Sequence, residues 1–197
     1  MIAGILEAKT YPEFKQKLAD SACTRCGLAA GRTRIVVDRG NPKADTLFIG
    51  EAPGANEDIQ GRAFVGRGGK LLDAMMKDEG FDTEEDCLIV NVVKCRPPDN
   101  RRPEPEEARE CAPFLKRQIE HVKPRFILLL GATALAHIAP EKKGFKMNEE
   151  AGKFFTHPDY PGARLMVLFH PAYILRDPRK KPLMKEHIQR FVAAHER

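Results

Sequence analysis

The chain has 197 residues, 42% of them hydrophobic and 31% charged, which suits one well-packed globular domain and is short for two. Its formal net charge of +5 permits a polyanionic partner without requiring one. The longest apolar stretch, from Phe126 to Ala139, is too short to cross a bilayer, and the first residues lack the basic lead of a signal peptide. We therefore expect a cytoplasmic protein without membrane contact.

Four short apolar runs indicate strands that are buried on both faces of a parallel sheet. They span residues 46–50, 87–93, 126–131 and 164–170. Helical patterns lie between and after them, at residues 69–80, 105–121, 132–138 and 183–194. This alternation predicts an α/β fold: a single domain over residues 1–197, built as an α/β/α sandwich around a central, mainly parallel, four-stranded sheet. The segment 141–161 indicates only a loop or hairpin.

Chemically useful side chains fall at the ends of these strands. Glu51 follows the first strand, Asn91 lies late in the second and His170 ends the fourth. Ligands of parallel sheets bind beyond the carboxyl ends of the strands, which meet at one edge. We therefore expect these three side chains to lie together in a binding site.

The segment 50–70 is rich in glycine and follows the first strand. Glycines let a backbone approach a flat or charged ligand, so the segment is typical of a binding loop, although a plain connection between a strand and a helix has the same composition. The segment lacks the spacing of a Walker phosphate-binding loop, because Leu71 stands where that motif has serine or threonine.

Four of the five cysteines form a pattern of metal ligands. Cys23 and Cys26 are two residues apart in a C-x2-C pair, and Cys95 and Cys111 follow far downstream. Four thiolates suit either a zinc ion or a [4Fe–4S] cluster, and the spacing does not separate the two. Because cytoplasmic thiols stay reduced, the pattern does not indicate disulfides. Cys87 belongs to neither pair and is expected to be a buried core thiol.

Several motifs in one order resemble the family 4 uracil-DNA glycosylases, iron–sulfur enzymes of bacteria and archaea. They are Gly-Glu-Ala-Pro-Gly at 50–54, Gly-Arg-Ala-Phe-Val-Gly at 61–66, the strand around Asn91, His-Pro-Ala-Tyr-Ile-Leu-Arg at 170–176, and the four cysteines. The resemblance runs from about Ala22 to about Phe191. It implies a uracil-DNA glycosylase-like fold and a repair enzyme that flips uracil out of DNA and hydrolyses its N-glycosidic bond. The resulting abasic site belongs to base excision repair.

The resemblance also implies roles for individual residues. Phe64 matches the aromatic residue on which a flipped uracil stacks, and Asn91 matches the side chain that pairs with the uracil edge. Glu51, Glu57 and His170 match the catalytic groups, and His170 is the one that faces uracil O2. The other implied positions are the loop residues Gly50, Ala52 and Gly54, and the [4Fe–4S] ligands Cys23, Cys26, Cys95 and Cys111.

Elementary chemistry supports these roles. A base inside a duplex must be extruded and then held by stacking and edge hydrogen bonds, and an amide offers the donor and acceptor that match uracil N3–H and O4. Bond cleavage builds negative charge on uracil O2, which a donor such as His170 stabilises. The main uracil-glycosylase family carries an aspartate where this chain has Ala52. Water positioning therefore falls to Glu51, to Glu57 or to the DNA phosphates, and we favour Glu51.

Basic residues gather near the same edge, and we expect Arg101 and Arg176 to contact DNA. The other members of this basic group are Lys94, Arg96, Arg102, Arg179, Lys180 and Lys181. Tyr173, Ile174 and Leu175 are candidates to fill the gap that a flipped nucleotide leaves. The expected partner is uracil-containing DNA, single- or double-stranded, and the expected protein is a monomer.

Two other functions stay open at this point. One is a zinc-stapled nucleic-acid-binding module without catalysis. The other is a nucleotide-binding redox protein whose cluster carries electrons, although no G-x-G-x-x-G motif follows a strand in this chain.

Overall fold

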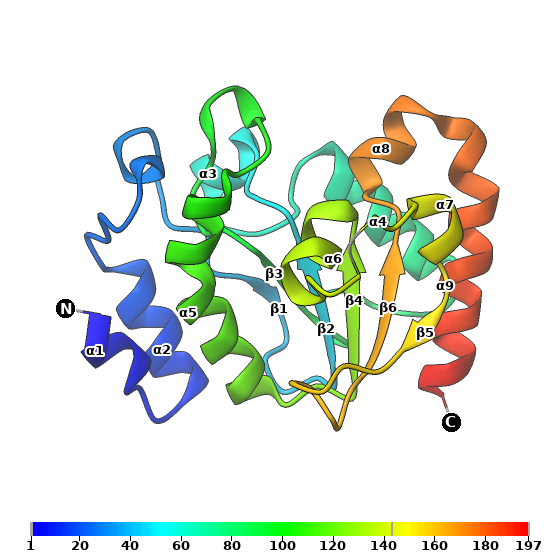
Figure 1. Ribbon diagram of the computed structural model, residues 1–197, viewed down its shortest axis with the longest axis horizontal. Helices are drawn as coiled ribbons and strands as arrows, with labels where there is room; N and C mark the ends of the chain where they lie inside the picture. The colour runs from blue at the N-terminus through cyan, green and yellow to red at the C-terminus, as the bar shows by residue number, and fades with distance from the viewer. Residues whose placement is uncertain (1, 143, 197) are drawn as a thin grey trace.

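The computed structural model describes residues 2–142 and 144–196 and contains a six-stranded sheet between two layers of helices (Figure 1). The strand order is β1-β3-β2-β4-β6-β5. The strands are β1 (Arg39–Gly40), β2 (Thr46–Gly50), β3 (Leu88–Asn91), β4 (Phe126–Leu130), β5 (Phe154–Phe155) and β6 (Arg164–Leu168). Strands β3, β2, β4 and β6 run parallel, whereas β1 and β5 pair antiparallel at the two edges.

The four parallel strands are those predicted from the sequence, and the predicted α/β sandwich is confirmed. Strand β2 has the predicted bounds, and the other three lie within two residues of theirs. The two antiparallel edge strands were not predicted. Each has two residues, too few for a run or an alternation of apolar side chains to be visible.

Helices cover both faces of the sheet, as Figure 1 shows. They are α1 (Ile2–Leu6), α2 (Tyr11–Ala19), α3 (Ala55–Gln60), α4 (Arg67–Lys77), α5 (Pro105–Val122), α6 (Ala132–Ile138), α7 (Met147–Glu150), α8 (Pro171–Arg176) and α9 (Lys181–His195). Leu47 and Ile49 of β2 pack in one core with side chains of α2, α5 and α6, whereas Phe48 packs in the other with α4 and α9. Burial on both faces explains the continuous apolar runs.

The four predicted helices are present, and their ends lie within three residues of the predicted ones. Two short helices replace segments that were expected to be loops: α3 lies inside the glycine-rich segment, and α8 follows directly after His170. Each has six residues, less than two turns, so no helical periodicity can be seen in the sequence.

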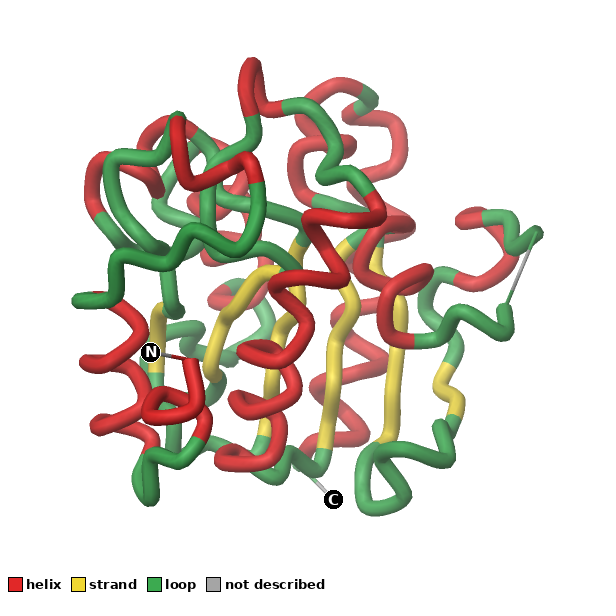
Figure 2. Tube along the Cα trace, turned by 60° about the vertical axis from the view of Figure 1, so that its left-hand side comes forward, coloured by secondary structure: helices red, strands yellow, loops and turns green. Residues whose placement is uncertain are grey.

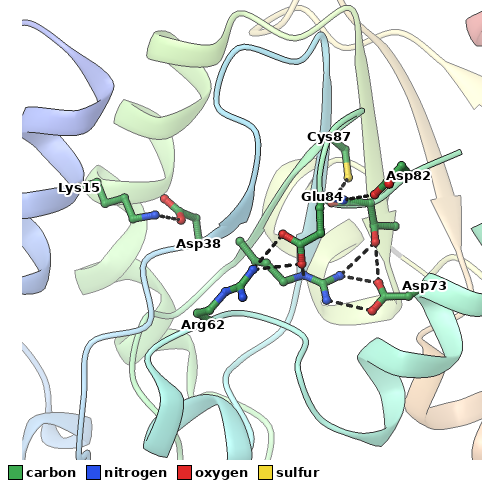
Figure 3. A network of polar contacts seen from close by, with 9 residues as sticks. Lys15, Asp38, Arg62, Asp73, Asp82, Glu84 and Cys87 are labelled. Atoms are coloured by element: carbon green, nitrogen blue, oxygen red, sulfur yellow. Dashed lines mark hydrogen bonds and ion pairs between the residues drawn. The ribbon is translucent and has the colours of Figure 1, made fainter.

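The β1 edge is fastened by a network of charged side chains (Figure 3). The Arg39 guanidinium donates to both carboxylate oxygens of Asp73, at 2.9 and 2.5 Å. Thr83 Oγ1 donates to Asp73 at 2.7 Å, and Glu84 lies between Arg39 and Arg62. The network joins β1 to α4 and to the loop before β3.

Loops and short helices gather beyond the carboxyl ends of the parallel strands, at the top of Figure 2. This is the edge where the sequence predicts a binding site. Over the described ranges of the chain, no helix is long and apolar enough to cross a membrane.

Candidate active site

A cleft of about 930 Å³ opens at this edge of the sheet. Its walls come from the segments that follow β2, β4 and β6, from the loop after Cys95, and from α7. Glu51, Phe64 and His170 all line it. The fold therefore brings together predicted site residues that are more than one hundred positions apart in the sequence.

Asn91 ends β3 in register with Gly50 of β2. It is buried, with 1% of its surface exposed, and neither its Oδ1 nor its Nδ2 has a hydrogen-bond partner in the described part of the chain. A Cβ atom at Gly50 would lie 2.5 Å from Asn91 Oδ1 and 2.5 Å from the Phe64 ring. Glycine at this position therefore leaves room for the Asn91 amide and the Phe64 ring side by side, although Phe64 lines the cleft and Asn91 is not among its lining residues.

Phe64 has an unusual backbone conformation. Its φ of 53° lies in the left-handed region, which costs a residue other than glycine about 1 kcal/mol or more. The residue lies between α3 and α4, and its ring centroid is 5.8 Å from that of His170. Strain of this kind concentrates at functional sites, where the surrounding structure holds it.

His170 is the N-cap of α8, and its Nδ1 accepts a hydrogen bond from the backbone N–H of Ala172 at 3.1 Å. An accepting Nδ1 carries no proton, so the neutral ring must carry its proton on Nε2. Burial lowers the pKa of His170 below its usual value, which favours this neutral form. The geometry thus leaves one N–H donor on the imidazole, at Nε2.

The two glutamates differ in what they contact. Glu51 accepts a hydrogen bond from Thr133 Oγ1 and is partly exposed to the cleft. Glu57 accepts from the backbone N–H groups of Gly54 at 3.1 Å and Gly66 at 2.7 Å. Glu57 therefore fastens the glycine-rich segment. Glu51 uses Oε2 for Thr133 and for Arg102, whose Nε lies 3.9 Å away, and its Oε1 has no partner in the described part of the chain. The contact of Thr133 has no signal in the sequence, because it depends on the approach of α6 to the end of β2.

Ala52 and Gly54 follow Glu51 along the cleft, and both line it. Gly54 is also the N-cap of α3. The predicted loop residues thus lie where the sequence places them, although the chain continues as a helix rather than as an extended loop.

Helix α8 places its residues on different sides. Tyr173 and Arg176 line the cleft, and Leu175 is exposed over 37% of its surface. Ile174 is buried in the core against α4 and α9. It cannot enter a DNA gap, so the expectation for Ile174 is wrong.

Arg101 lies at the cleft, but its guanidinium is already paired. It donates to the two carboxylate oxygens of Glu107 at 2.9 and 2.6 Å, and these bonds lower the pKa of Glu107. Lys146 and Asn148, at the start of α7, also line the cleft. Neither residue could be predicted as part of the site, because their segment has neither a motif nor an apolar pattern.

The four predicted metal ligands line one small cavity. Cys23 and Cys26 come from the segment after α2, Cys95 from the loop after β3, and Cys111 from α5. Among the described residues, no three His, Cys, Asp or Glu side chains converge tightly enough to hold a single ion. A zinc ion needs its sulfurs about 2.3 Å from one point. An iron–sulfur cluster binds each thiolate through a different iron, which suits four thiols spaced around a cavity.

Three cations and one carboxylate line this cavity: Arg25, Arg32, Lys94 and Glu110, and Glu110 pairs with Arg25 at 2.9 Å. Arg32 Nη1 lies 3.6 Å from Cys95 Sγ, and Lys94 lines the same cavity. Lys94 was expected on the basic surface near the DNA, and this is wrong, because only 1% of it is exposed. Burial raises the pKa of Cys95 to about 12 and that of Cys111 to about 11, so these thiols keep their protons until a metal displaces them. Cations beside four thiols suit a metal–thiolate group with net negative charge.

The fifth cysteine lies elsewhere. Cys87 is fully buried, and its Sγ donates to the backbone carbonyl of Thr83 at 3.3 Å. The prediction of a core thiol at Cys87 is confirmed.

The family model described as the uracil DNA glycosylase superfamily matches residues 37–194, and the chain belongs to this superfamily. It is 45% identical over 157 residues to the type-4 uracil-DNA glycosylase of Thermotoga maritima, which covers 79% of each chain. It is 40% identical over 177 residues to that of Saccharolobus solfataricus, covering 87% of this chain and 81% of the relative. Within the superfamily, the chain is a member of the type-4 uracil-DNA glycosylases. The type-5 uracil-DNA glycosylase of Pyrobaculum aerophilum is more distant, at 28% identity over 159 residues, or 71% of this chain and 66% of the relative.

Proposed function

We propose that this protein removes uracil from DNA by hydrolysing the N-glycosidic bond, which leaves an abasic site for base excision repair. The unpaired amide of Asn91 carries the proposal. A buried polar group without a partner costs about 1–3 kcal/mol. Among the described residues, Asn91 is the one with two buried and unpaired side-chain polar atoms, and a ligand that binds both recovers this cost. Uracil N3–H donates and uracil O4 accepts, which complements the accepting Oδ1 and the donating Nδ2 of the amide, and the Phe64 ring beside the amide offers a stacking surface.

The surrounding residues supply the chemistry of bond cleavage. As the bond breaks, negative charge develops on uracil O2, and the Nε2–H of neutral His170 is the donor that stabilises it. Positive charge develops on the sugar, where water attacks. Glu51, oriented by Thr133, is the carboxylate that positions this water, because Ala52 has none and Glu57 is occupied by backbone amides.

The cysteine site completes the proposal. Cys23, Cys26, Cys95 and Cys111 would hold a [4Fe–4S] cluster, and the four thiols with cations beside them support this assignment. When bound, the cluster supplies metal–thiolate bonds that join the N-terminal segment, the loop after β3 and α5. We assign it no redox step in base removal, and we propose that residues 1–197 form one glycosylase-like domain that acts as a monomer.

The activity is tested by incubating the purified protein with a uracil-containing oligonucleotide in chelator and then cleaving abasic sites with alkali. We expect strand cleavage at the uracil. Asn91→Ala should lose most of it, and Asn91→Asp should shift residual activity toward cytosine, because a protonated carboxyl can pair with the cytosine edge. Asn41→Ala is the matched control, since Asn41 is a surface residue bound to the Glu85 carbonyl. Absence of cleavage by the wild-type protein, or full activity in both Asn91 variants, would contradict the proposal.

The cluster is tested separately by metal analysis. The aerobically purified protein should be brown and contain about four iron atoms per chain. Serine at Cys23, Cys26, Cys95 or Cys111 should bleach the protein, whereas Cys87→Ser should leave it brown. Stoichiometric zinc in a colourless protein would favour a zinc-stapled nucleic-acid-binding module instead.

A further inference from the structure

Lys94 lies between the residue that meets the base and a residue of the cysteine site. Only Val92 and Val93 separate it from Asn91, and Cys95 follows it directly. Its side chain is buried, and its Nζ donates a hydrogen bond of 2.6 Å to the backbone carbonyl of Asn91. It also lines the cavity of the four cysteines. One residue thus contacts both sites.

The charge of Lys94 has no carboxylate partner. Over residues 2–142 and 144–196, no Asp or Glu oxygen forms an ion pair with Nζ, and its one hydrogen bond goes to a neutral carbonyl. Asp38 acts on Lys94 from a longer distance, but its carboxylate is held by Tyr11 Oη and Lys15 Nζ, each at 2.7 Å. A buried charge without compensation is strongly unfavourable, so anions close to Nζ would stabilise the charged form of Lys94.

The cysteine site is the source of those anions. Lys94 lines the cavity of the four cysteines, and Cys95 follows it directly in the chain. Four thiolates around a [4Fe–4S] core carry more negative charge than the core offsets. The negative charge of a cysteine site that holds a cluster would therefore balance the positive charge of the Lys94 ammonium group.

We propose that Lys94 is a positioning residue that couples the two sites: its ammonium group is the counter-ion of the filled cysteine site and holds the Asn91 carbonyl. Loading of the cysteine site then fixes the strand end that presents the Asn91 amide to uracil. The positioning of Asn91 for uracil rests on the proposed function. The role of Lys94 as a counter-ion does not rest on it, because that role concerns only the cysteine site.

The test compares Lys94→Met, which keeps the length of the side chain and removes the charge, with Lys77→Met. Lys77 is an exposed residue of α4 and serves as the matched control. The loss of visible absorbance in excess iron chelator should be about tenfold faster in Lys94→Met than in wild type, and unchanged in Lys77→Met. Lys94→Arg, which restores the charge, should slow the loss again. Should Lys94→Met fail to fold, Lys94→Gln is measured in its place.

Coupling to Asn91 is tested by a double-mutant cycle. Lys94→Met should slow single-turnover uracil excision about tenfold in the wild-type background, a size typical of residues in one hydrogen-bonded network. It should have no further effect in the Asn91→Ala background, because the amide that Lys94 positions is absent there. Equal slowing in both backgrounds, or wild-type iron retention in Lys94→Met, would overturn the inference. If the wild-type protein excised no uracil, the proposed function would fail, while iron retention would still decide whether Lys94 is the counter-ion.

Discussion

Arg39 and Asn91 lie on the paired strands β1 and β3, and both side chains are buried and polar. The guanidinium of Arg39 is bound by Asp73 and lies beside Glu84 and Thr83. The amide of Asn91 has no partner among the described residues. Arg39 Nε also lacks a hydrogen bond, but Glu84 lies 3.6 Å from it, whereas no group of the described chain compensates the Asn91 amide. Buried polar groups on the two strands thus differ in how far the protein itself compensates them.

This difference in pairing distinguishes a part of the sheet that stabilises the fold from a part that is available to bind a ligand. At the β1 edge, pairing of charges offsets much of the cost of their burial and joins β1 to α4. At the carboxyl end of β3 the cost is left uncompensated, and the strained backbone of Phe64 adds to it. Such costs persist where ligand binding recovers them and the rest of the fold supplies enough stability.

The strongest test of this comparison is Arg39→Met. Removal of one partner from a buried ion pair typically costs about 3–5 kcal/mol in the free energy of unfolding, and we expect the lower end because Asp73 is one-third exposed. Arg62→Met is the control: Arg62 pairs with Glu84 but is 55% exposed, so its loss should cost about 1 kcal/mol or less. Chemical denaturation measures both. Equal destabilisation by the two variants would show that the buried network is not what fastens β1.

The next largest effect is expected at His170, with the loss in activity rather than stability. His170→Ala should lower the single-turnover rate of uracil excision about 10²–10³-fold, or about 2.7–4 kcal/mol, the cost of deleting one oxyanion donor. Glu51→Gln should cost less, because a merely positioned water can still attack. A larger defect in Glu51→Gln than in His170→Ala would make Glu51 the main catalytic group.

The pH dependence sharpens this prediction. Burial lowers the pKa of His170 below its usual value near 6.5, so the ring is neutral at and above that pH. If the neutral ring is the donor, titration of His170 should not lower the excision rate between pH 6.5 and pH 8. A rate that falls through pH 6.5 as the pH rises would indicate a protonated imidazole as the donor.

The sequence predicts elements that depend on a local pattern of residues. It does not predict elements that depend on contacts with distant segments. The run Thr46–Gly50 predicts β2 to the residue, because a strand buried on both faces must be apolar throughout. Strands β1 and β5 are too short to leave a pattern, and helices α3 and α8 have less than two turns. Their presence depends on the sheet edge and the caps that they meet.

The same limit applies to the site. The motifs predict Asn91, Phe64 and His170 as site residues, and the fold places Phe64 close to both of the others. Residue types do not predict three features of the site. Glu57 binds backbone amides, the side chain of Lys94 is buried, and the Asn91 amide has no partner among the described residues. Each outcome depends on which partners the folded chain brings within hydrogen-bond distance. The roles of these residues in uracil removal stay predictions.

Phe64 offers a smaller but more specific test. Phe64→Ala should lose a stacking contact worth about 1–3 kcal/mol per base, which lowers kcat/KM for uracil excision. Phe64→Leu keeps an apolar side chain without an aromatic face and should recover only part of this loss. Steady-state kinetics on one oligonucleotide measure both variants. If Phe64→Leu were fully active, the ring would be packing rather than a stacking surface.

The smallest effect separates two arginines at the cleft, one free and one paired. Arg176 lines the cleft without an ion pair in the described residues, whereas Arg101 is held by Glu107 at 2.9 and 2.6 Å. A plot of log binding constant against log salt concentration has a negative slope, and a lost phosphate contact reduces the magnitude of this slope by about 0.9. Arg176→Gln should show this change and keep the single-turnover rate. Arg101→Gln should leave the slope nearly unchanged, because its charge is already neutralised by a carboxylate. Binding titrations at several salt concentrations measure both slopes. A larger change in slope for Arg101→Gln than for Arg176→Gln would mean that a DNA phosphate replaces Glu107 as the partner of Arg101. Ion pairing within the protein would then not exclude a polar group at this edge from DNA binding.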